Sequence, residues 1–330
     1  MNVQTTGLVE EDRAAVTLPN FFVVGAPKAG TTSLYHYLDQ HPDVYMSPIK
    51  EPNYFAAEIR PENFSPDLHQ WVEAELRAVR LYLDSETLQK RFGGLILEWQ
   101  DYVRLFQEAQ GQAAVGEASA CYLWSATAAN RIAQKMPHAK IIMILRHPAE
   151  RAYSQYLQNL ASGLIEGSFR KQIQKSAHSE PKLFSPMNPL LGFGLYYHQV
   201  KRFLTVFPGE QVLVSFYEDY LSNPANFIAE IFRFLGVDSD FRLDLSQRYL
   251  EPQVPRLRGT TQLLQKMGVW QFARKLTPSS LHGSLRQVVF KKRSRLALSA
   301  DDRAFLMDFY REDVNQLSSL LHRDLSHWLR

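Results

Sequence analysis

Residues 21–34 constrain the fold of this chain more than any other stretch. Apolar residues 21–24 predict a short buried strand, a turn with glycine and proline follows, and an apolar-periodic helix begins near residue 31. Such a loop points backbone N–H groups and the positive end of the helix dipole at one place, which favours a bound phosphate group. Lys28 adds a mobile positive charge, and the hydroxyls of residues 31–33 add hydrogen-bond donors. The stretch therefore predicts a phosphate-binding loop.

The order of residues in this loop differs from that of a Walker A motif. Gly25 and Gly30 have the Walker A spacing, but Thr31 stands where that motif has its lysine. The lysine lies inside the loop instead, as Lys28. We therefore expect a phosphate site without the Mg²⁺-holding arrangement of Walker A proteins, and we expect no metal.

Four further segments predict strands of one parallel sheet. Residues 140–145 are the clearest, because they are apolar on both faces, as in a buried parallel strand. The other predicted strands are residues 44–46, 113–119 and 211–216. With 330 residues, of which 45% are hydrophobic, the chain can bury a full core. We predict a P-loop-like α/β fold, in which helices flank a central parallel sheet within a single domain.

Arg146 follows the strand predicted at residues 140–145, and a helix is expected from Pro148, a favourable first-turn position. Ser154 lies on this helix, eight residues after Arg146. A guanidinium group matches phosphate oxygens through two parallel hydrogen bonds. Arg146 is therefore a second candidate for phosphate binding, at the carboxyl end of a strand.

The run Pro27-Lys28-x-Gly30-Thr31-Thr32 resembles the 5′-phosphosulfate loop of sulfotransferases that use 3′-phosphoadenylyl sulfate (PAPS). Members of that family grip the 3′-phosphate of the nucleotide with an Arg and a Ser at the spacing of Arg146 and Ser154. The resemblance implies that this chain moves a sulfuryl group from PAPS to an acceptor hydroxyl.

Two later segments extend the resemblance, so that the motifs cover roughly residues 21–260 in the family's order. The run 217–219 is similar to a Tyr-Glu-Asp that lies near the nucleotide, and the run 258–260 is similar to a basic-Gly loop that closes over the 3′-phosphate. The nucleotide-binding residues that the resemblance implies are Lys28, Ala29, Gly30, Thr31, Thr32, Ser33, Arg146, Ser154, Tyr217, Arg258, Gly259 and Thr260.

Glu51 lies in a proline-bracketed loop just beyond the strand predicted at residues 44–46. By itself, the neighbouring pair of Lys50 and Glu51 is typical of a solvated surface. Heparan-type sulfotransferases, however, carry at this place a catalytic-base Glu that an aromatic pair follows. Glu51 with Tyr54 and Phe55 matches that pattern. The resemblance thus implies Glu51 as general base beside Lys28, with the two aromatic residues on the acceptor side.

The chain departs from the heparan-type pattern after the strand predicted at residues 113–119. Where those relatives read Glu-Lys-Ser/Thr, this chain has Ala118 in the place of a lysine that serves the active site. The departure suggests a different acceptor pocket. His178 and His198 are further candidates for proton transfer on the acceptor side, although a structural or exposed position is the more ordinary reading of each.

We divide the chain into a flexible leader, residues 1–18, and a sulfotransferase domain, residues 19–330. Residues 163–194 are rich in glycine and proline, which favours a lid or binding loop, and the resemblance implies that this loop belongs to the acceptor site. Residues 252–300 hold ten Arg or Lys and no Asp or Glu. Two readings of the basic segment 256–295 stay open: a solvated face, or a dock for an acidic carrier protein, glycan or lipid surface.

Composition limits the partners and the cellular compartment that we expect for the protein. A net charge of +3 predicts little about partners, and we expect no nucleic-acid partner. Cys121 is the only cysteine, which excludes an internal disulfide and fits a reducing compartment. No signal-peptide pattern and no apolar run of membrane-spanning length is present in the sequence. We expect a cytoplasmic protein without a transmembrane segment.

Two other functions remain open at this point. A P-loop kinase would use the same fold with ATP and Mg²⁺, against which the displaced lysine argues. A non-catalytic nucleotide-binding module would bind PAPS without turnover, which Ala118 makes conceivable. The acceptor also stays open between a glycan, a small molecule and the β-hydroxyacyl chain of an acyl carrier protein, as in sulfotransferase domains of polyketide synthases.

Overall fold

The computed structural model describes residues 17–161, 164–177, 190–245, 253–255, 290–292 and 298–330. Its centre is a five-stranded sheet of order β2-β5-β1-β6-β7, and every neighbouring pair in it is parallel. This confirms the predicted fold class. The strands are β1 (Phe21–Gly25), β2 (Val44–Met46), β5 (Ala114–Ala118), β6 (Lys140–Leu145) and β7 (Val212–Phe216).

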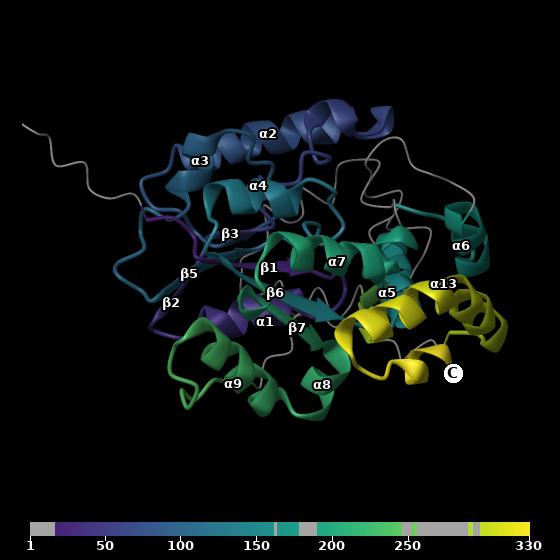
Figure 1. Ribbon diagram of the computed structural model, residues 1–330. Coiled ribbons are helices and arrows are strands. Elements are labelled where there is room, and N and C mark those ends of the chain that lie inside the picture. The colour runs from purple at the N-terminus through teal and green to yellow at the C-terminus, as the bar shows by residue number, and fades with distance from the viewer. Residues whose placement is uncertain (1–16, 162–163, 178–189, 246–252, 256–289, 293–297) are drawn as a thin grey trace, which may run out of the picture.

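Helices cover both faces of the sheet (Figure 1). In that view α2, α3 and α4 lie above the sheet, and α1, α8 and α9 lie below it. The C-terminal helix α13 packs beside α5 and α7. The α-helices are α1 (Thr31–Leu38), α2 (His69–Leu83), α3 (Trp99–Arg104), α4 (Ala128–Lys135), α5 (Pro148–Ala161), α6 (Phe169–Ala177), α7 (Tyr196–Val206), α8 (Tyr217–Ser222), α9 (Pro224–Leu235) and α13 (Ala300–Leu321).

Two short ribbons flank the main sheet. β3 (Ile49–Lys50) pairs in parallel with β4 (Arg91–Phe92), and β8 (Gln253–Pro255) pairs antiparallel with β9 (Phe290–Lys292). The first ribbon matters for the site, because it leads directly into Glu51.

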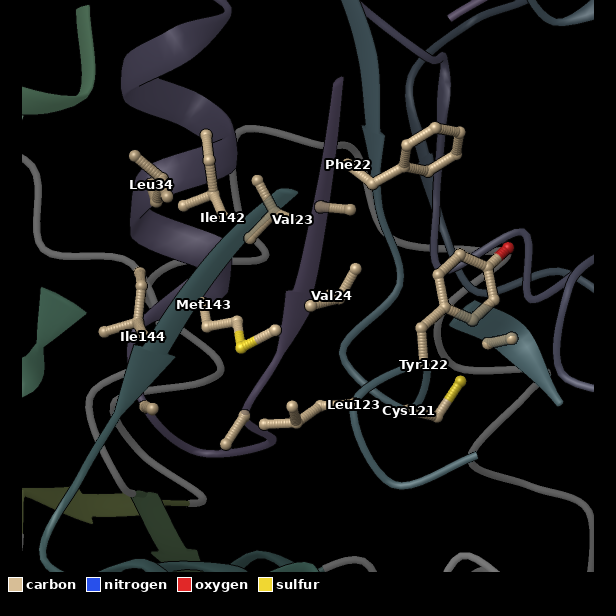
Figure 2. Packing of buried hydrophobic residues seen from close by; sticks show 14 of the residues in the cluster. Phe22, Val23, Val24, Leu34, Cys121, Tyr122, Leu123, Ile142, Met143 and Ile144 are labelled. Carbon is tan, nitrogen blue, oxygen red and sulfur yellow. The ribbon is translucent and has the colours of Figure 1, made fainter. Parts of the chain in front are cut away.

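The core lies on both faces of β1, whose five residues are all buried. Side chains alternate along a strand, so Val23 faces Leu34 and Ile142 on one side while Phe22 faces Tyr122 on the other (Figure 2). Apolar contact on both faces explains why this strand reads as a continuous apolar run.

Two predicted segments differ from the structure. The helix α6 occupies part of the stretch expected to be an irregular loop, because Phe169 and Ile173, one turn apart, bury its inner face. The sequence also predicts a final helix over residues 300–327, but α13 ends at Leu321 and His322 follows in a left-handed conformation (φ 49°). Among the described residues, no helix combines the length and apolar character needed to cross a membrane.

Candidate active site

The loop between β1 and α1 leaves the start of the helix open to an anion. Gly30 precedes α1 with φ 90°, and among the described residues no side chain caps the helix there. The first N–H groups of a helix have no partner within it, so those of residues 31–33 are oriented toward the loop. A Cβ on Gly30 would come within 3.0 Å of the Tyr217 ring. Glycine is thus required both for the left-handed backbone and for the close approach of Tyr217.

Arg146 closes the other side of this loop. Its Nη1 donates a hydrogen bond of 2.9 Å to the carbonyl of Lys28, and its guanidinium group lies 4.8 Å from the centre of the Tyr217 ring. The structure therefore brings Lys28, Gly30, Arg146 and Tyr217 together from the ends of β1, β6 and β7. All four are among the residues predicted to bind the nucleotide, and they lie together at the carboxyl edge of the sheet.

The Lys28 side chain donates a hydrogen bond of 2.6 Å from Nζ to Oε1 of Gln158 on α5. Burial and, to a smaller extent, the nearby charges of Arg146, Lys50 and Arg151 together lower the pKa of Lys28 to about 8. An anion bound among these groups would neutralise the repulsion between them. The site is therefore electrostatically prepared for a polyanionic ligand.

Glu51 is held by contacts at its backbone and at its carboxylate. Its N–H donates to the carbonyl of Ala118 (2.9 Å), and Asn53 Nδ2 donates to its carbonyl (2.9 Å). At the carboxylate, Oε2 accepts a 2.8 Å hydrogen bond from the N–H of Ala120, and Oε1 forms an ion pair with Lys50. The carboxylate keeps 17% of its side-chain surface exposed, whereas the Lys50 side chain keeps 3%. Lys50 is therefore a buried counter-ion and not the solvated residue that its sequence position suggests.

The loop that anchors Glu51 packs directly on the phosphate loop. A Cβ on Gly25 would lie 2.6 Å from Cβ of Leu123 and 3.0 Å from the carbonyl of Ala120. The N–H of Leu123 also donates to the carbonyl of Val24 (2.8 Å). Since Ala120 binds the carboxylate of Glu51, the two loops place Glu51 and Lys28 in one neighbourhood.

Left-handed backbone at non-glycine residues coincides with the predicted catalytic residues. Within the described chain it occurs at Lys28 (φ 68°), Glu51 (φ 67°), Asn53 (φ 60°) and His322. Such conformations cost of the order of 1–3 kcal/mol each and persist where the surroundings impose them, often at functional sites. Both residues that the sequence indicated as catalytic are among them.

The other predicted residues lie in several surroundings. Ser154 lies on α5, one turn before Gln158. Tyr54 and Phe55 are both buried, and Tyr54 stacks on Tyr102 with ring centres 4.8 Å apart. His198 is exposed on α7. His178, residues 258–260 and nearly all of the basic segment 256–295 lie outside the described residues, as does most of the leader.

Two residues that contact the predicted catalytic residues were not predicted as site residues from the sequence: Gln158, which binds Lys28, and Lys50, which pairs with Glu51. The signal for Gln158 is its position four residues after Ser154, because helical residues at that spacing share a face. For Lys50, the sequence showed a charge beside Glu51 but gave no sign of its burial. In the described part of the chain, no three His, Cys, Asp or Glu side chains gather as metal ligands would.

The fold and the site define an α/β protein with a parallel sheet, an anion-binding loop of non-Walker order and a carboxylate beside it. The chain belongs to the sulfotransferase family, whose family model matches residues 19–241. It is 28% identical to the bifunctional heparan sulfate N-deacetylase/N-sulfotransferase 2 of Bos taurus, over 97% of this chain and 32% of that protein. It is also 28% identical to carbohydrate sulfotransferase 15 of Mus musculus, over 87% of this chain and 54% of that protein.

The chain thus spans a third to a half of the length of these two curated relatives. The chain is also similar to the solved structure of a sulfotransferase from Alicyclobacillus acidocaldarius, with 31% sequence identity and a TM-score of 0.69. The alignment covers 96% of this chain and 100% of that chain. The similarity in length and fold supports a parallel-sheet sulfotransferase domain that occupies most of the present chain.

Proposed function

We propose that this chain transfers the sulfuryl group of PAPS to a hydroxyl of an acceptor, with Glu51 as general base. The observation that carries the proposal is the pairing of two loops: the anion-binding loop of Lys28 packs through Gly25 on the loop whose Ala120 binds the Glu51 carboxylate. An anion site and a partly exposed carboxylate are the two groups that such a transfer requires at one place.

The residues present fit a nucleotide with phosphate groups at two ends. The open N-terminus of α1 and Lys28 suit the 5′-phosphosulfate, and Arg146 with Ser154 on α5 suits the 3′-phosphate. When bound, PAPS supplies an activated sulfuryl group and leaves as adenosine 3′,5′-bisphosphate (PAP). Lys28 and the loop amides would stabilise the negative charge that grows on the 5′-phosphate side, which is the electrostatic contribution that commonly dominates.

Glu51 would accept the proton of the acceptor hydroxyl as the hydroxyl oxygen forms its bond to sulfur and the sulfur–phosphate oxygen bond breaks. Lys50 and the Ala120 N–H orient the Glu51 carboxylate before the transfer. After Glu51 takes up the proton, Lys50 remains as a buried positive charge beside the site. The cation beside Glu51 is thus Lys50 on β3, whereas Ala118 on β5 carries no charge.

The acceptor that we favour is a carbohydrate. The names of two relatives, a heparan sulfate N-sulfotransferase and a carbohydrate sulfotransferase, support this class. A hydroxyacyl chain on an acidic carrier protein is the alternative, with the basic segment 256–295 as the dock, and salt-sensitive binding would support it.

The experiment has two stages. Thermal-shift titrations with PAP and with ATP plus Mg²⁺ test the nucleotide, and we expect stabilisation by PAP but not by ATP. PAP release is then followed by chromatography with a panel of glycans, amino sugars and hydroxyacyl carrier proteins. Turnover with a hydroxyl acceptor would support the proposal. Stabilisation by ATP alone would contradict it, and PAP binding without turnover of any acceptor would favour a non-catalytic module.

A further inference from the structure

Glu117 is a fully buried carboxylate at the end of β5 that the proposed reaction does not use. Three hydroxyl groups donate hydrogen bonds to it. Tyr102 and Tyr122 donate to Oε1 at 3.0 and 2.8 Å, and Ser119 donates to Oε2 at 2.7 Å. A buried carboxylate is costly unless such donors satisfy it, so the three hydroxyl protons are directed at Glu117.

Two of these hydroxyls also contact the loop that carries Glu51. The oxygen of Ser119 accepts a hydrogen bond from the N–H of Asn53 (3.2 Å), and the oxygen of Tyr122 accepts one from the N–H of Phe55 (3.2 Å). A hydroxyl has one proton and two lone pairs. When its proton points to Glu117, its lone pairs are free to accept from the loop.

Asn53 connects this network to Glu51 itself. Its Nδ2 donates to the carbonyl of Glu51 (2.9 Å), and its Oδ1 accepts from Sγ of Cys121 (2.8 Å). Both Glu51 and Asn53 have left-handed backbones, which need fixed partners to persist. Of these supports, the Tyr122 hydroxyl lies on the face of β1 away from α1, on the side opposite Leu34 (Figure 2).

We propose that Glu117 is a positioning residue: by orienting the hydroxyls of Ser119 and Tyr122, it fixes the loop at residues 51–55 and so aims Glu51 at the acceptor. The inference rests on the proposed role of Glu51 as base. In this role Glu117 acts through the two hydroxyls: its hydrogen bonds within the described chain go to Ser119, Tyr122 and Tyr102, and none joins it to the Glu51 carboxylate.

The ionisation of Glu117 gives this role a pH dependence. Burial raises the pKa of Glu117 to about 7, with the charge of Glu51 adding to the rise, while hydrogen bonds from Ser119, Tyr122 and Tyr102 oppose it. Within the described part of the chain these groups face Glu117 from α3, from the loop after β5 and from the loop at Glu51, and the buried Cys121 thiol of the loop after β5 also interacts with its charge. Below about pH 7 the carboxyl gains a proton and loses acceptor capacity, so the hydroxyls lose their fixed direction.

The test compares Glu117→Gln with Tyr102→Phe as a matched control. Each variant removes hydrogen bonding at the buried carboxylate, but Tyr102 contacts no backbone N–H of the loop through its hydroxyl. With Glu117→Gln we expect kcat to fall about 10- to 100-fold while the affinity for PAP is retained, because a small misplacement of a reacting group costs that much. Tyr102→Phe should keep kcat within about threefold of the wild type.

The pH profile of kcat separates positioning from mere support of the fold. The wild type should lose activity as pH falls below about 7, and Glu117→Gln should lack that loss because its side chain does not titrate there. Ser119→Ala, which is the milder change, should lower kcat in the same direction. In the double variant Glu117→Gln/Ser119→Ala the two losses should be less than additive, since both lie on one chain of contacts.

Equal kcat values and equal pH profiles in wild type and Glu117→Gln would overturn the proposal, as would strictly additive losses in the double variant. PAP titration by thermal shift confirms that each variant is folded; if Glu117→Gln is not, the kcat and pH profile of Ser119→Ala decide the outcome alone. Glu51→Gln is measured in parallel. If Glu51→Gln retains full turnover, the assignment of Glu51 as base fails. If turnover is lost in Glu51→Gln but not in Glu117→Gln, the positioning role of Glu117 is refuted and the proposed function stands.

Discussion

The proposed nucleotide side of the site and the proposed base side differ in how the chain builds them. Lys28 and Gly30 come from one loop after β1, and Arg146 and Tyr217 follow the strands β6 and β7 of the same sheet. Glu51 instead depends on contacts from several segments, with Lys50 on β3 and Ala120 after β5 at its carboxylate. The geometry of the nucleotide side follows from the order of the strands, and the geometry of the base side follows from packing between loops.

The comparison explains why the two halves respond differently to change. A parallel sheet brings the carboxyl ends of its strands to one edge, so the place of the anion site follows from strand order. The proposed base, Glu51, depends instead on an ion pair with buried Lys50, on a backbone N–H and on its own left-handed backbone. Substitutions on the base side should therefore act on turnover, and substitutions on the nucleotide side on affinity.

The largest effect is expected from Glu51→Gln. The amide cannot accept the acceptor's proton, so turnover should fall about 10²- to 10⁴-fold with PAP affinity retained. Steady-state PAP release and a PAP thermal-shift titration measure the two quantities. Glu58→Gln is the matched control, because Glu58 also accepts hydrogen bonds from a loop N–H (Ala126, 2.8 Å) and a hydroxyl (Ser125, 2.6 Å). Near-normal turnover in Glu51→Gln would remove it from the base role.

Arg146→Ala should weaken PAP binding about 10- to 100-fold, the range that loss of charge-assisted hydrogen bonds covers. The variant also removes the 2.9 Å contact with the Lys28 carbonyl, so the loop itself is affected. Isothermal titration with PAP measures the loss. Arg77→Ala, an exposed arginine on α2, controls for the change in net charge. Unchanged affinity in Arg146→Ala would refute the assignment of this residue to the nucleotide.

PAP affinity should also fall as pH rises above about 8. Lys28 has its pKa lowered to about 8 in the free protein by burial and by neighbouring cations. Bound phosphate groups favour the charged form and raise that pKa, so binding takes up a proton above pH 8 and affinity declines by up to about tenfold per pH unit. Below pH 8 the affinity should level off because Lys28 is already charged. Lys28→Arg, which stays protonated, should remove this dependence; a persistent decline would assign it to another group.

The smallest expected effect is on stability, from Gly30→Ala. Alanine at φ 90° costs about 1–2 kcal/mol of unfolding free energy, and its Cβ would also meet the Tyr217 ring. Gly111→Ala is a matched control, since Gly111 has φ 82° and no atom within 4 Å of the added Cβ. Denaturant titration gives the loss of unfolding free energy in each variant, and the difference between the two losses is the contribution of the contact with Tyr217. Equal losses with equal PAP affinity would show that Tyr217 does not press on the loop.

Several local features were predictable from the sequence because they depend on neighbouring residues. The apolar run of β1, the glycine-bearing loop and the start of α1 follow from periodicity and turn chemistry. The same holds for β6, which ends at Arg146, and for β7, which ends at Tyr217. The helix α6 was missed because its short apolar face lies among glycines and prolines that indicate a loop.

The sequence by itself predicted the parallel α/β fold and the anion-binding loop with Lys28 from its patterns of residues, whereas Glu51 was selected through the family resemblance and its role as base is a proposal. Only the tertiary structure decided that Lys50 is buried against Glu51 and that the hydroxyls of Ser119 and Tyr122 join Glu117 to the same loop. These contacts join residues of different segments, and the sequence separation between Glu51 and Ala120 is 69 residues. No local pattern encodes such a distance, since burial and the direction of a hydroxyl proton depend on what the folded chain packs around them.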